Sequence, residues 1–263
     1  MNIDSSIIYK YQSQGVAVLR KIISNYWIKK LQIGVKKNFE KPSKYKCVYE
    51  KKGIKEVFYD DYCNWQRIDE YKTFFINSGI SKIVSQLMKS KKVNIFHEHV
   101  LIKEPGSIKK TPWHQDQSYY CVNGKDNCSL WIPLDLVNKS VCPEFIKGSH
   151  KWNKQFLPTK FFGESYVHYD EEFENIPDIE KNKDNYDIIS WSLKPGDAIA
   201  FNFATVHGAP ANKSKFLRRA FSARFTGDDA TYHKRKGETS PPFPEVKLKN
   251  GDKMDCPTFP RIL

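Results

Sequence analysis

The sequence lacks several features that mark specialised protein classes. It contains no apolar run of the roughly 18 residues that a membrane-spanning helix needs, and no internal repeat or low-complexity block. Its N-terminus, MNIDSSIIYKYQSQGVAVL, has no basic start, long apolar stretch or small-residue cleavage site of a secretory signal. These absences argue against a membrane-spanning or secreted protein, and we expect a cytoplasmic location.

Paired cysteine motifs are also absent. The six cysteines are spread over 263 residues, with no CxxC pair and no dense framework. Spacing of this kind does not indicate a disulfide scaffold, so we expect reduced thiols. The cysteines are Cys47, Cys63, Cys121, Cys128, Cys142 and Cys256.

What the chain does have is the composition of a globular protein. It is 40% hydrophobic and 14% aromatic, and 263 residues suit one large domain, 1–263, better than two small ones. The net charge is +13, but the lysines are interleaved with other residues along the whole chain. A dispersed excess of basic side chains predicts a solvated basic surface, or else an anionic small ligand, rather than a nucleic-acid partner.

Two helices are indicated in the N-terminal region, about 1–92. A short strand at 15–19 precedes a helix that begins at Ser24 or Asn25 and ends before Pro42. Apolar residues at four-residue spacing give this helix a core-facing stripe: Trp27, Leu31, Val35 and Phe39. A second helix begins at about Ser78 and has a similar stripe.

From about Val93 onward, short β-prone segments alternate with turns rich in Gly and Pro. This pattern predicts a mainly β fold of the double-stranded β-helix, or jelly-roll, type, cupin-like, with the two helices packed outside it. We expect its core at 93–229, an acidic insert at 163–190 that forms a lid, and a tail at 230–263 that wraps the surface. The clearest strands are 93–103, 128–137, 197–203 and 218–226.

The sequence WHQDQ places His114 and Asp116 two positions apart, so on an extended backbone both side chains project from one face. His207, after an apolar strand, could supply a third metal ligand. Two imidazoles and one carboxylate form the facial triad of non-haem iron oxygenases, which leaves open coordination positions. The HxD pair alone is a weak signal, but ordered turns and Arg218 strengthen it.

Those ordered motifs are similar to the phytanoyl-CoA dioxygenase family of Fe(II)- and 2-oxoglutarate-dependent oxygenases. The resemblance runs over about 103–229 and rests on KEPGSIKKTPWHQD, LWIPLD, FIKGSHK, LKPGDAIAFNFATVHGAPANKS and RRAFSARFTGDD. It implies Fe(II) held by His114, Asp116 and His207, with O₂ and 2-oxoglutarate as cosubstrates and ascorbate as a compound that can stimulate turnover. Arg218 matches the family arginine that binds the distal carboxylate of 2-oxoglutarate.

The resemblance also suggests pocket residues around the iron. Gln115 and Trp131 match positions that line the pocket in family members, and Ser222 could donate to the cosubstrate carboxylate or be satisfied by backbone instead. Ala209 stands where the family often has a serine. Arg219 competes with Arg218, but strand alternation allows only one of the two to point inward.

Further polar residues are less clearly placed. His97 and His99 share a face and could reach the pocket, because the strand before the HxD pair does so in this fold; we expect packed or surface histidines rather than ligands. Arg224 and Lys103 are interior candidates that favour a polar or anionic small-molecule substrate.

The implied reaction is hydroxylation of a small, polar or anionic organic substrate, with release of succinate and CO₂. Asp116 favours hydroxylation over halogenation, because related halogenases carry a small residue in its place; desaturation and ring closure stay open. Two alternatives remain: a nucleic-acid demethylase of the same cofactor class, and a non-catalytic jelly-roll binding protein.

Overall fold

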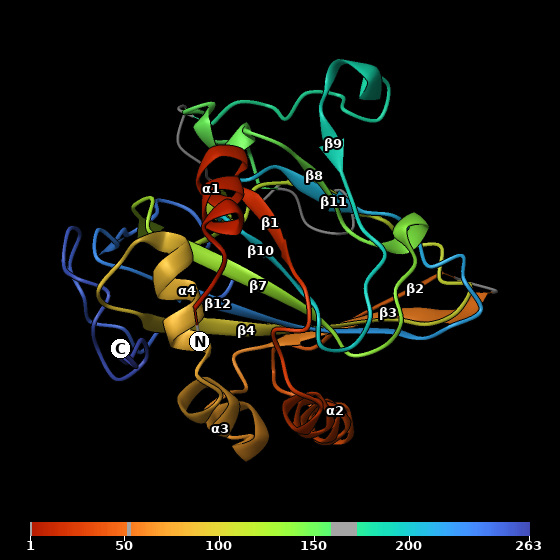
Figure 1. The fold of residues 1–263 in the computed structure, drawn as a ribbon, viewed down its shortest axis with the longest axis horizontal. Helices are drawn as coiled ribbons and strands as arrows, with labels where there is room; N and C mark the ends of the chain where they lie inside the picture. The colour runs from red at the N-terminus through yellow and green to blue at the C-terminus, as the bar shows by residue number, and fades with distance from the viewer. Residues whose placement is uncertain (1, 52–53, 159–172) are drawn as a thin grey trace.

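Two antiparallel β-sheets face each other in the computed structural model, which describes residues 2–51, 54–158 and 173–263 (Figure 1). A seven-stranded sheet has the order β1-β10-β7-β12-β4-β3-β2, and a four-stranded sheet has the order β5-β11-β8-β9. A short pair, β13-β6, lies apart from both. The arrangement confirms the predicted mainly β, jelly-roll class.

The strands predicted most clearly are all present, as β4, β7, β10 and β12. In chain order the strands are β1 (Val16–Leu19), β2 (Cys47–Lys51), β3 (Ile54–Tyr62), β4 (Asn94–Lys103), β5 (Thr111–His114), β6 (Val122–Asn123), β7 (Asn127–Pro133), β8 (Glu144–Ile146), β9 (Ile188–Ile189), β10 (Ala198–Phe201), β11 (His207–Ala209), β12 (Arg218–Thr226) and β13 (Thr231–Tyr232).

Within the part of the chain that the structure describes, four α-helices accompany the sheets, where the sequence predicted two. The predicted pair corresponds to α2 and α4, and α2 ends before Pro42 as expected. The other two were not predicted: α1 is capped by Asp4 but buries only Tyr11, and α3 has no side-chain cap but buries Tyr71, Phe74 and Phe75. The helices are α1 (Ser5–Gln14), α2 (Asn25–Glu40), α3 (Asp69–Asn77) and α4 (Ile80–Met88).

The N-terminal region does not lie wholly outside the β-core. Strands β1, β2 and β3 belong to the same seven-stranded sheet as β4, so the core does not begin at about Val93. Val16 of β1 pairs with Phe201 of β10 across most of the chain, and no local pattern reports a partner so distant. The seven-stranded sheet therefore extends beyond the segment 93–229 that the sequence predicted for the core.

The two faces of the seven-stranded sheet have different roles. Helices α2, α3 and α4 pack on one face, in a cluster that includes Val100 of β4 with Phe221 and Phe225 of β12 (Figure 1). The alternate positions of β12, among them Arg218 and Ser222, lie on the face toward the four-stranded sheet. This alternation places charged and hydroxyl side chains between the two sheets.

The insert and the tail both differ from expectation. Residues 163–172 of the insert lie outside the described residues, and its last part supplies β9 to the four-stranded sheet. The tail is more than a surface wrap: Met254 and Phe259 are buried in a cluster with Phe96 and Tyr120. The tail thus completes part of the hydrophobic core.

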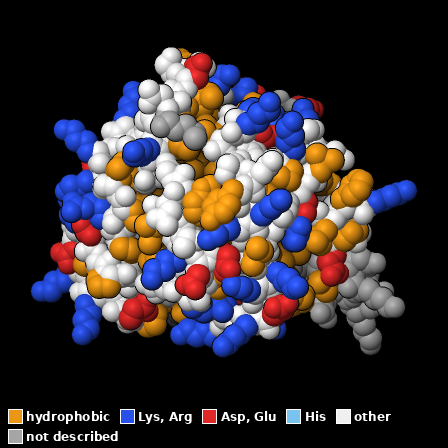
Figure 2. All heavy atoms as spheres, turned by 60° about the horizontal axis from the view of Figure 1, so that its bottom comes forward, with side chains coloured by type: hydrophobic (Ala, Val, Ile, Leu, Met, Phe, Trp, Pro, Cys, Tyr) orange, Lys and Arg blue, Asp and Glu red, His pale blue; other side chains and the backbone are white. Residues whose placement is uncertain are grey.

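The exposed surface shows no single basic patch on the face drawn in Figure 2, where Lys and Arg side chains are dispersed among acidic and apolar ones. All six cysteines are unpaired. Over the stretches that the structure describes, no helix combines the length and apolar character needed to cross a bilayer.

Candidate active site

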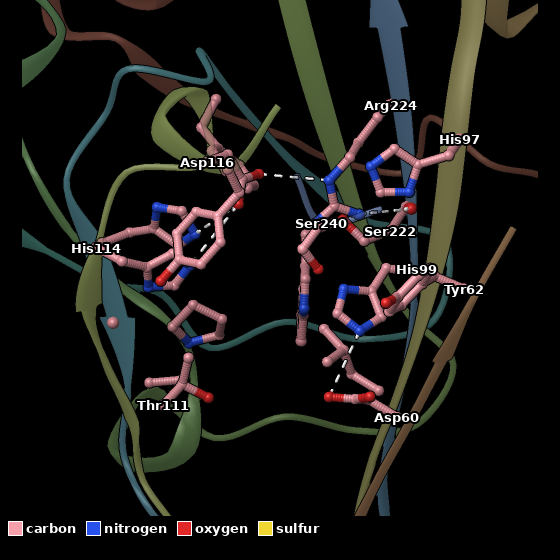
Figure 3. A pocket seen from close by; sticks show the side chains of 18 of the residues that line it. Asp60, Tyr62, His97, His99, Thr111, His114, Asp116, Ser222, Arg224 and Ser240 are labelled. Carbon is pink, nitrogen blue, oxygen red and sulfur yellow. Dashed lines mark hydrogen bonds and ion pairs between the residues drawn. The ribbon is translucent and has the colours of Figure 1, made fainter. Parts of the chain in front are cut away.

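Two histidines meet where β5 and β11 pair in the four-stranded sheet. His114 ends β5 and lies directly opposite His207, the first residue of β11, and the ring centroids are 4.2 Å apart. Asp116 lies beyond the strand with φ −61° and ψ −38°, so its backbone is not extended. The regular strand ends at His114, earlier than expected, but the side chains of His114 and Asp116 still lie on the same side of the cavity (Figure 3).

The three side chains form a compact set of donor atoms. One ligand atom from each of His114, Asp116 and His207 lies within 4.8 Å of the others. Asp116 Oδ1 is 3.7 Å from His114 Nε2 and 4.0 Å from His207 Nε2. Two imidazoles and one carboxylate on one side of a cavity fit a non-haem Fe(II) centre.

Hydrogen bonds fix which ring nitrogens can bind a metal. His114 Nδ1 lies 2.7 Å from the carbonyl oxygen of Pro112, and His207 Nδ1 lies 2.9 Å from that of Thr205. A carbonyl can only accept, so each Nδ1 carries the proton and each Nε2 keeps its lone pair. Burial, with His114 beside it, lowers the pKa of His207 to about 3, which keeps this ring neutral.

The carboxylate of Asp116 is oriented by partners on its far oxygen. Ser129 donates to Oδ2 at 3.0 Å and Arg224 Nε donates to the same atom at 3.4 Å, so Oδ1 remains directed at the imidazoles (Figure 3). Burial alone would raise the pKa of Asp116, but Arg224 and the two histidines hold it well below its usual range. The residue therefore stays an anionic donor.

Arg218 lines the same cavity and is 4% exposed. Its guanidinium donates to the carbonyl of Val141. No carboxylate of the described residues lies within ion-pair distance of it, and burial lowers its pKa to about 10. A buried cation without an anion is costly, so this position suits a ligand carboxylate.

The neighbouring arginine points elsewhere. Arg219 forms a bidentate ion pair with Asp135, at 2.7 and 3.0 Å. The alternation expected along β12 therefore holds, and Arg218 is the arginine at the cavity.

The resemblance suggested three further pocket residues, Gln115, Trp131 and Ser222, and two of them line the cavity. Trp131 and Ser222 lie directly opposite each other in the β12–β7 register, and both contribute to the wall. The Ser222 hydroxyl is buried without a hydrogen-bond partner, so backbone does not satisfy it.

Gln115 is not part of this cavity, which corrects its assignment as a cosubstrate-binding residue. Its amide donates to the carbonyls of Lys154 and Ala204, and its Oε1 accepts from the backbone N–H of Phe156. Gln115 faces away from the triad because the chain leaves the strand at His114. Its side-chain hydrogen bonds connect the segment after β5 to two neighbouring loops.

Lys103, an interior cation that the sequence predicted, is already hydrogen-bonded within the protein. Lys103 is fully buried, and its amine donates to Thr111 Oγ1 at 3.2 Å and to the Pro210 carbonyl at 3.1 Å. Burial, with Arg218 nearby, holds the pKa of Lys103 well below its usual range. Lys103 is not among the residues that line the cavity.

The cavity has a volume of about 360 Å³ and a second polar wall that the sequence did not predict. His97 and His99, expected to be packed or on the surface, both line it, together with Asp60 and Tyr62 of β3 (Figure 3). Ser240 from the tail also reaches the cavity. The shared parity of His97 and His99 along β4 was the available signal, but their partners on β3 could only be found in three dimensions.

The expected lid is not seen over this cavity. Residues 173–190, the described part of the insert, contribute none of its lining, and residues 163–172 lie outside the described part of the chain.

Comparison with known proteins agrees with this geometry. The family model for phytanoyl-CoA dioxygenase (PhyH) matches residues 11–220. A curated "Probable phytanoyl-CoA dioxygenase" from Caenorhabditis elegans is 26% identical over 159 residues, which is 57% of this chain and 49% of the relative. The chain thus spans about half the length of that relative.

Solved structures share the fold at low identity. The carbocyclase SnoK from nogalamycin biosynthesis, described as non-haem and α-ketoglutarate-dependent, has a TM-score of 0.77 at 21% identity, covering 100% of this chain and 97% of its own. The epimerase SnoN, solved with Fe³⁺, α-ketoglutarate and nogalamycin RO, has a TM-score of 0.76 at 17% identity and covers 98% of each chain.

Proposed function

Since the chain belongs to the phytanoyl-CoA dioxygenase family, we propose that it is an Fe(II)- and 2-oxoglutarate-dependent dioxygenase. Its reaction hydroxylates a small polar organic substrate with O₂ and releases succinate and CO₂. The observation that carries this proposal is the buried cluster of His114, Asp116 and His207 beside a cavity.

The protein's own residues prepare this site before any ligand arrives. The Nδ1–H groups of His114 and His207 donate to backbone carbonyls, so both Nε2 lone pairs are available without rotation of the rings. Ser129 and Arg224 donate hydrogen bonds to Asp116 Oδ2 and so keep Oδ1 available. Bound iron would supply the redox chemistry that activates O₂.

Arg218 would bind the distal carboxylate of 2-oxoglutarate, with Ser222 as a hydroxyl donor nearby. A planar guanidinium can make two parallel hydrogen bonds to a carboxylate, which fixes the cosubstrate's direction. Trp131, opposite Ser222 in the sheet, adds an apolar wall that excludes water.

A test of this function uses purified protein with Fe(II), ascorbate and 2-oxoglutarate, without added substrate. The wild type is expected to bind iron and form succinate slowly, whereas Asp116→Ala and His207→Ala lose both. Asp187→Asn, an exposed change on the same protein, serves as the matched control. Unchanged iron binding and turnover in both triad variants would contradict the assignment.

The nucleic-acid demethylase is the second candidate, favoured by the net charge of +13. Against it, the basic side chains are dispersed on the face seen in Figure 2, and both arginines at the cavity already have roles. Binding of methylated DNA that falls steeply with added salt, together with repair of the base, would support it instead.

The non-catalytic binding protein makes a different prediction. A vestigial or zinc-filled site requires no open coordination positions, whereas the proposed enzyme requires redox-active iron. Metal analysis after aerobic and anaerobic purification separates these two cases.

A further inference from the structure

The wall opposite the iron ligands is polar, and strand register assigns its residues to one face. In the pairing of β4 with β12, His99 lies opposite Ser222 and His97 lies opposite Arg224. Asp60 of β3 lies opposite Leu101, two residues beyond His99 on β4, and on the same face. Figure 3 shows His114 and Asp116 on one side of the cavity and Asp60, His97 and His99 on the other.

Polar atoms on this wall have no partner in the protein. His97 is 2% exposed and Ser222 is 1% exposed, yet His97 Nε2 and Ser222 Oγ make no hydrogen bond. His97 Nδ1 lies 3.1 Å from the carbonyl of Glu98, so it carries the proton and Nε2 is left as an acceptor. Burial, with Arg224 nearby, holds the pKa of His97 well below its usual range, so the ring is neutral.

Asp60 adds an anionic acceptor to the same wall. It is 2% exposed, and the Tyr49 hydroxyl donates to its Oδ2 at 3.2 Å. His99 Nε2 is 3.6 Å from the same oxygen, too far for a hydrogen bond. No Lys or Arg of the described chain lies within ion-pair distance of Asp60. A carboxylate can accept about four hydrogen bonds, so Asp60 retains unused capacity.

Among the described residues that line the cavity, no cation is left for an anionic substrate. Its lining contains two arginines, of which Arg224 is engaged with Asp116 and Arg218 is assigned to 2-oxoglutarate under the function proposed above. Lys103 does not reach the lining. An incoming carboxylate or phosphate on the far wall would therefore meet Asp60 and neutral acceptors.

We propose that Asp60, His97 and His99 form the subsite for the prime substrate, and that this subsite selects a small molecule presenting O–H or N–H donors rather than an anion. The inference rests on the proposed function and narrows its substrate class. Donors on the substrate would satisfy Asp60 and His97 Nε2. The same contacts would direct one of its C–H bonds across the cavity toward the triad.

The test measures binding to the anaerobic Fe(II) and 2-oxoglutarate complex, as a shift in thermal unfolding midpoint and by calorimetry. Three sets of probes are compared: hydroxyl donors (myo-inositol and methyl glucoside), ammonium donors (ethanolamine and putrescine), and anions (glycerol phosphate and acetyl-CoA). The variants are Asp60→Asn and His97→Phe, with Asp187→Asn as the matched control, since Asp187 is exposed and paired with Lys147.

At least one donor set is expected to bind the wild type and the control more tightly than the anions do. Asp60→Asn should weaken that binding by about tenfold or more, because a charged hydrogen-bond acceptor is lost. The control Asp187→Asn, which lies outside the cavity, should bind the same donors and form succinate without substrate at a rate within about twofold of wild type.

Three results would overturn the inference: tighter binding of the anions, no binding of either donor set, or donor binding that survives both cavity variants. Failure of the proposed function is seen separately, as a wild-type protein that neither binds iron nor forms succinate. Circular dichroism and iron binding of Asp60→Asn show whether that variant is folded.

Discussion

At the scale of single residues, the site is defined by which polar atoms have partners and which do not. The Nδ1 atoms of His114 and His207 and the far oxygen of Asp116 are all held by the protein. Among the residues that the structure describes, the guanidinium of Arg218 has only the carbonyl of Val141 as a partner. The protein thus satisfies the atoms that orient the ligands and leaves the ligand-facing atoms available.

The two neighbouring arginines give a direct test of this distinction. Arg218→Ala should raise the KM for 2-oxoglutarate by roughly 10- to 100-fold, because a charge-assisted hydrogen bond to the cosubstrate is lost. Arg219→Ala removes only the pair with Asp135 and should change the KM little. Steady-state kinetics at saturating iron measures both, and a larger effect from Arg219 would reverse the assignment.

Glu98 predicts how stability depends on pH. Burial raises the pKa of Glu98 to about 8, although the backbone N–H groups of Asn64 and Trp65 donate to its carboxylate. Between the unfolded value near 4.5 and the folded value, the folded state holds a proton that the unfolded chain has released. The free energy of unfolding should therefore fall as pH rises through this window, by up to about 1.4 kcal/mol per pH unit.

The measurement compares urea unfolding of wild type and Glu98→Gln at pH 5, 6.5 and 8. The variant cannot ionise, but its amide loses one acceptor for the two backbone donors. It should be the less stable protein at pH 5, and the gap should shrink or reverse toward pH 8. A gap that does not change with pH would contradict the assignment to Glu98.

At the scale of elements, close packing between α2 and α3 depends on the absence of a side chain at Gly34. A Cβ built there would lie 2.5 Å from Cε1 of Tyr71, whose side chain is fully buried. Alanine favours a helix over glycine by about 1 kcal/mol, but overpacking costs about 1–3 kcal/mol. The expected balance is a loss of stability.

Gly34→Ala should accordingly lower the thermal midpoint, as measured by circular dichroism. Ile33→Ala, a half-exposed change on the same helix, is the control and should have a small effect. A raised midpoint for Gly34→Ala would show that the two helices separate more easily than their packing suggests.

The elements also show what a local pattern can and cannot predict. Alternation along β12 correctly separates Arg218 from Arg219, because side-chain direction in a strand depends only on the parity of position. The same reasoning put the side chains of His114 and Asp116 on one side, and they lie together although the regular strand ends at His114. Helix α1 buries only Tyr11, so periodicity gave it no stripe, whereas Tyr71, Phe74 and Phe75 were an available signal for α3.

At the scale of the whole molecule, the C-terminal tail completes part of the hydrophobic core. Phe259 of the tail is fully buried against Phe96 and Phe243, and the backbone of β4 donates to the Pro260 carbonyl. The tail is therefore expected to be needed for stability, even though it follows the last long strand.

Phe259→Ala should destabilise the protein by about 3–5 kcal/mol, the usual cost of removing a buried phenyl ring. Phe216→Ala is the matched control, because Phe216 is 57% exposed and should change stability by less than about 0.5 kcal/mol. Equal midpoints in urea for the two variants would show that the tail does not contribute to the core.

The sequence by itself determined the mainly β jelly-roll class and the residue types of the His-Asp-His cluster, because strand periodicity and ligand chemistry are local properties of the chain. Only the tertiary structure decided which side chains meet: His114 with His207, Asp116 with Arg224, and Asp60 with His99. It also turned Gln115 away from the cavity and brought His97 into it. These contacts join strands far apart in the chain, and pairing at such distances is set by the packing of whole sheets rather than by neighbouring residues.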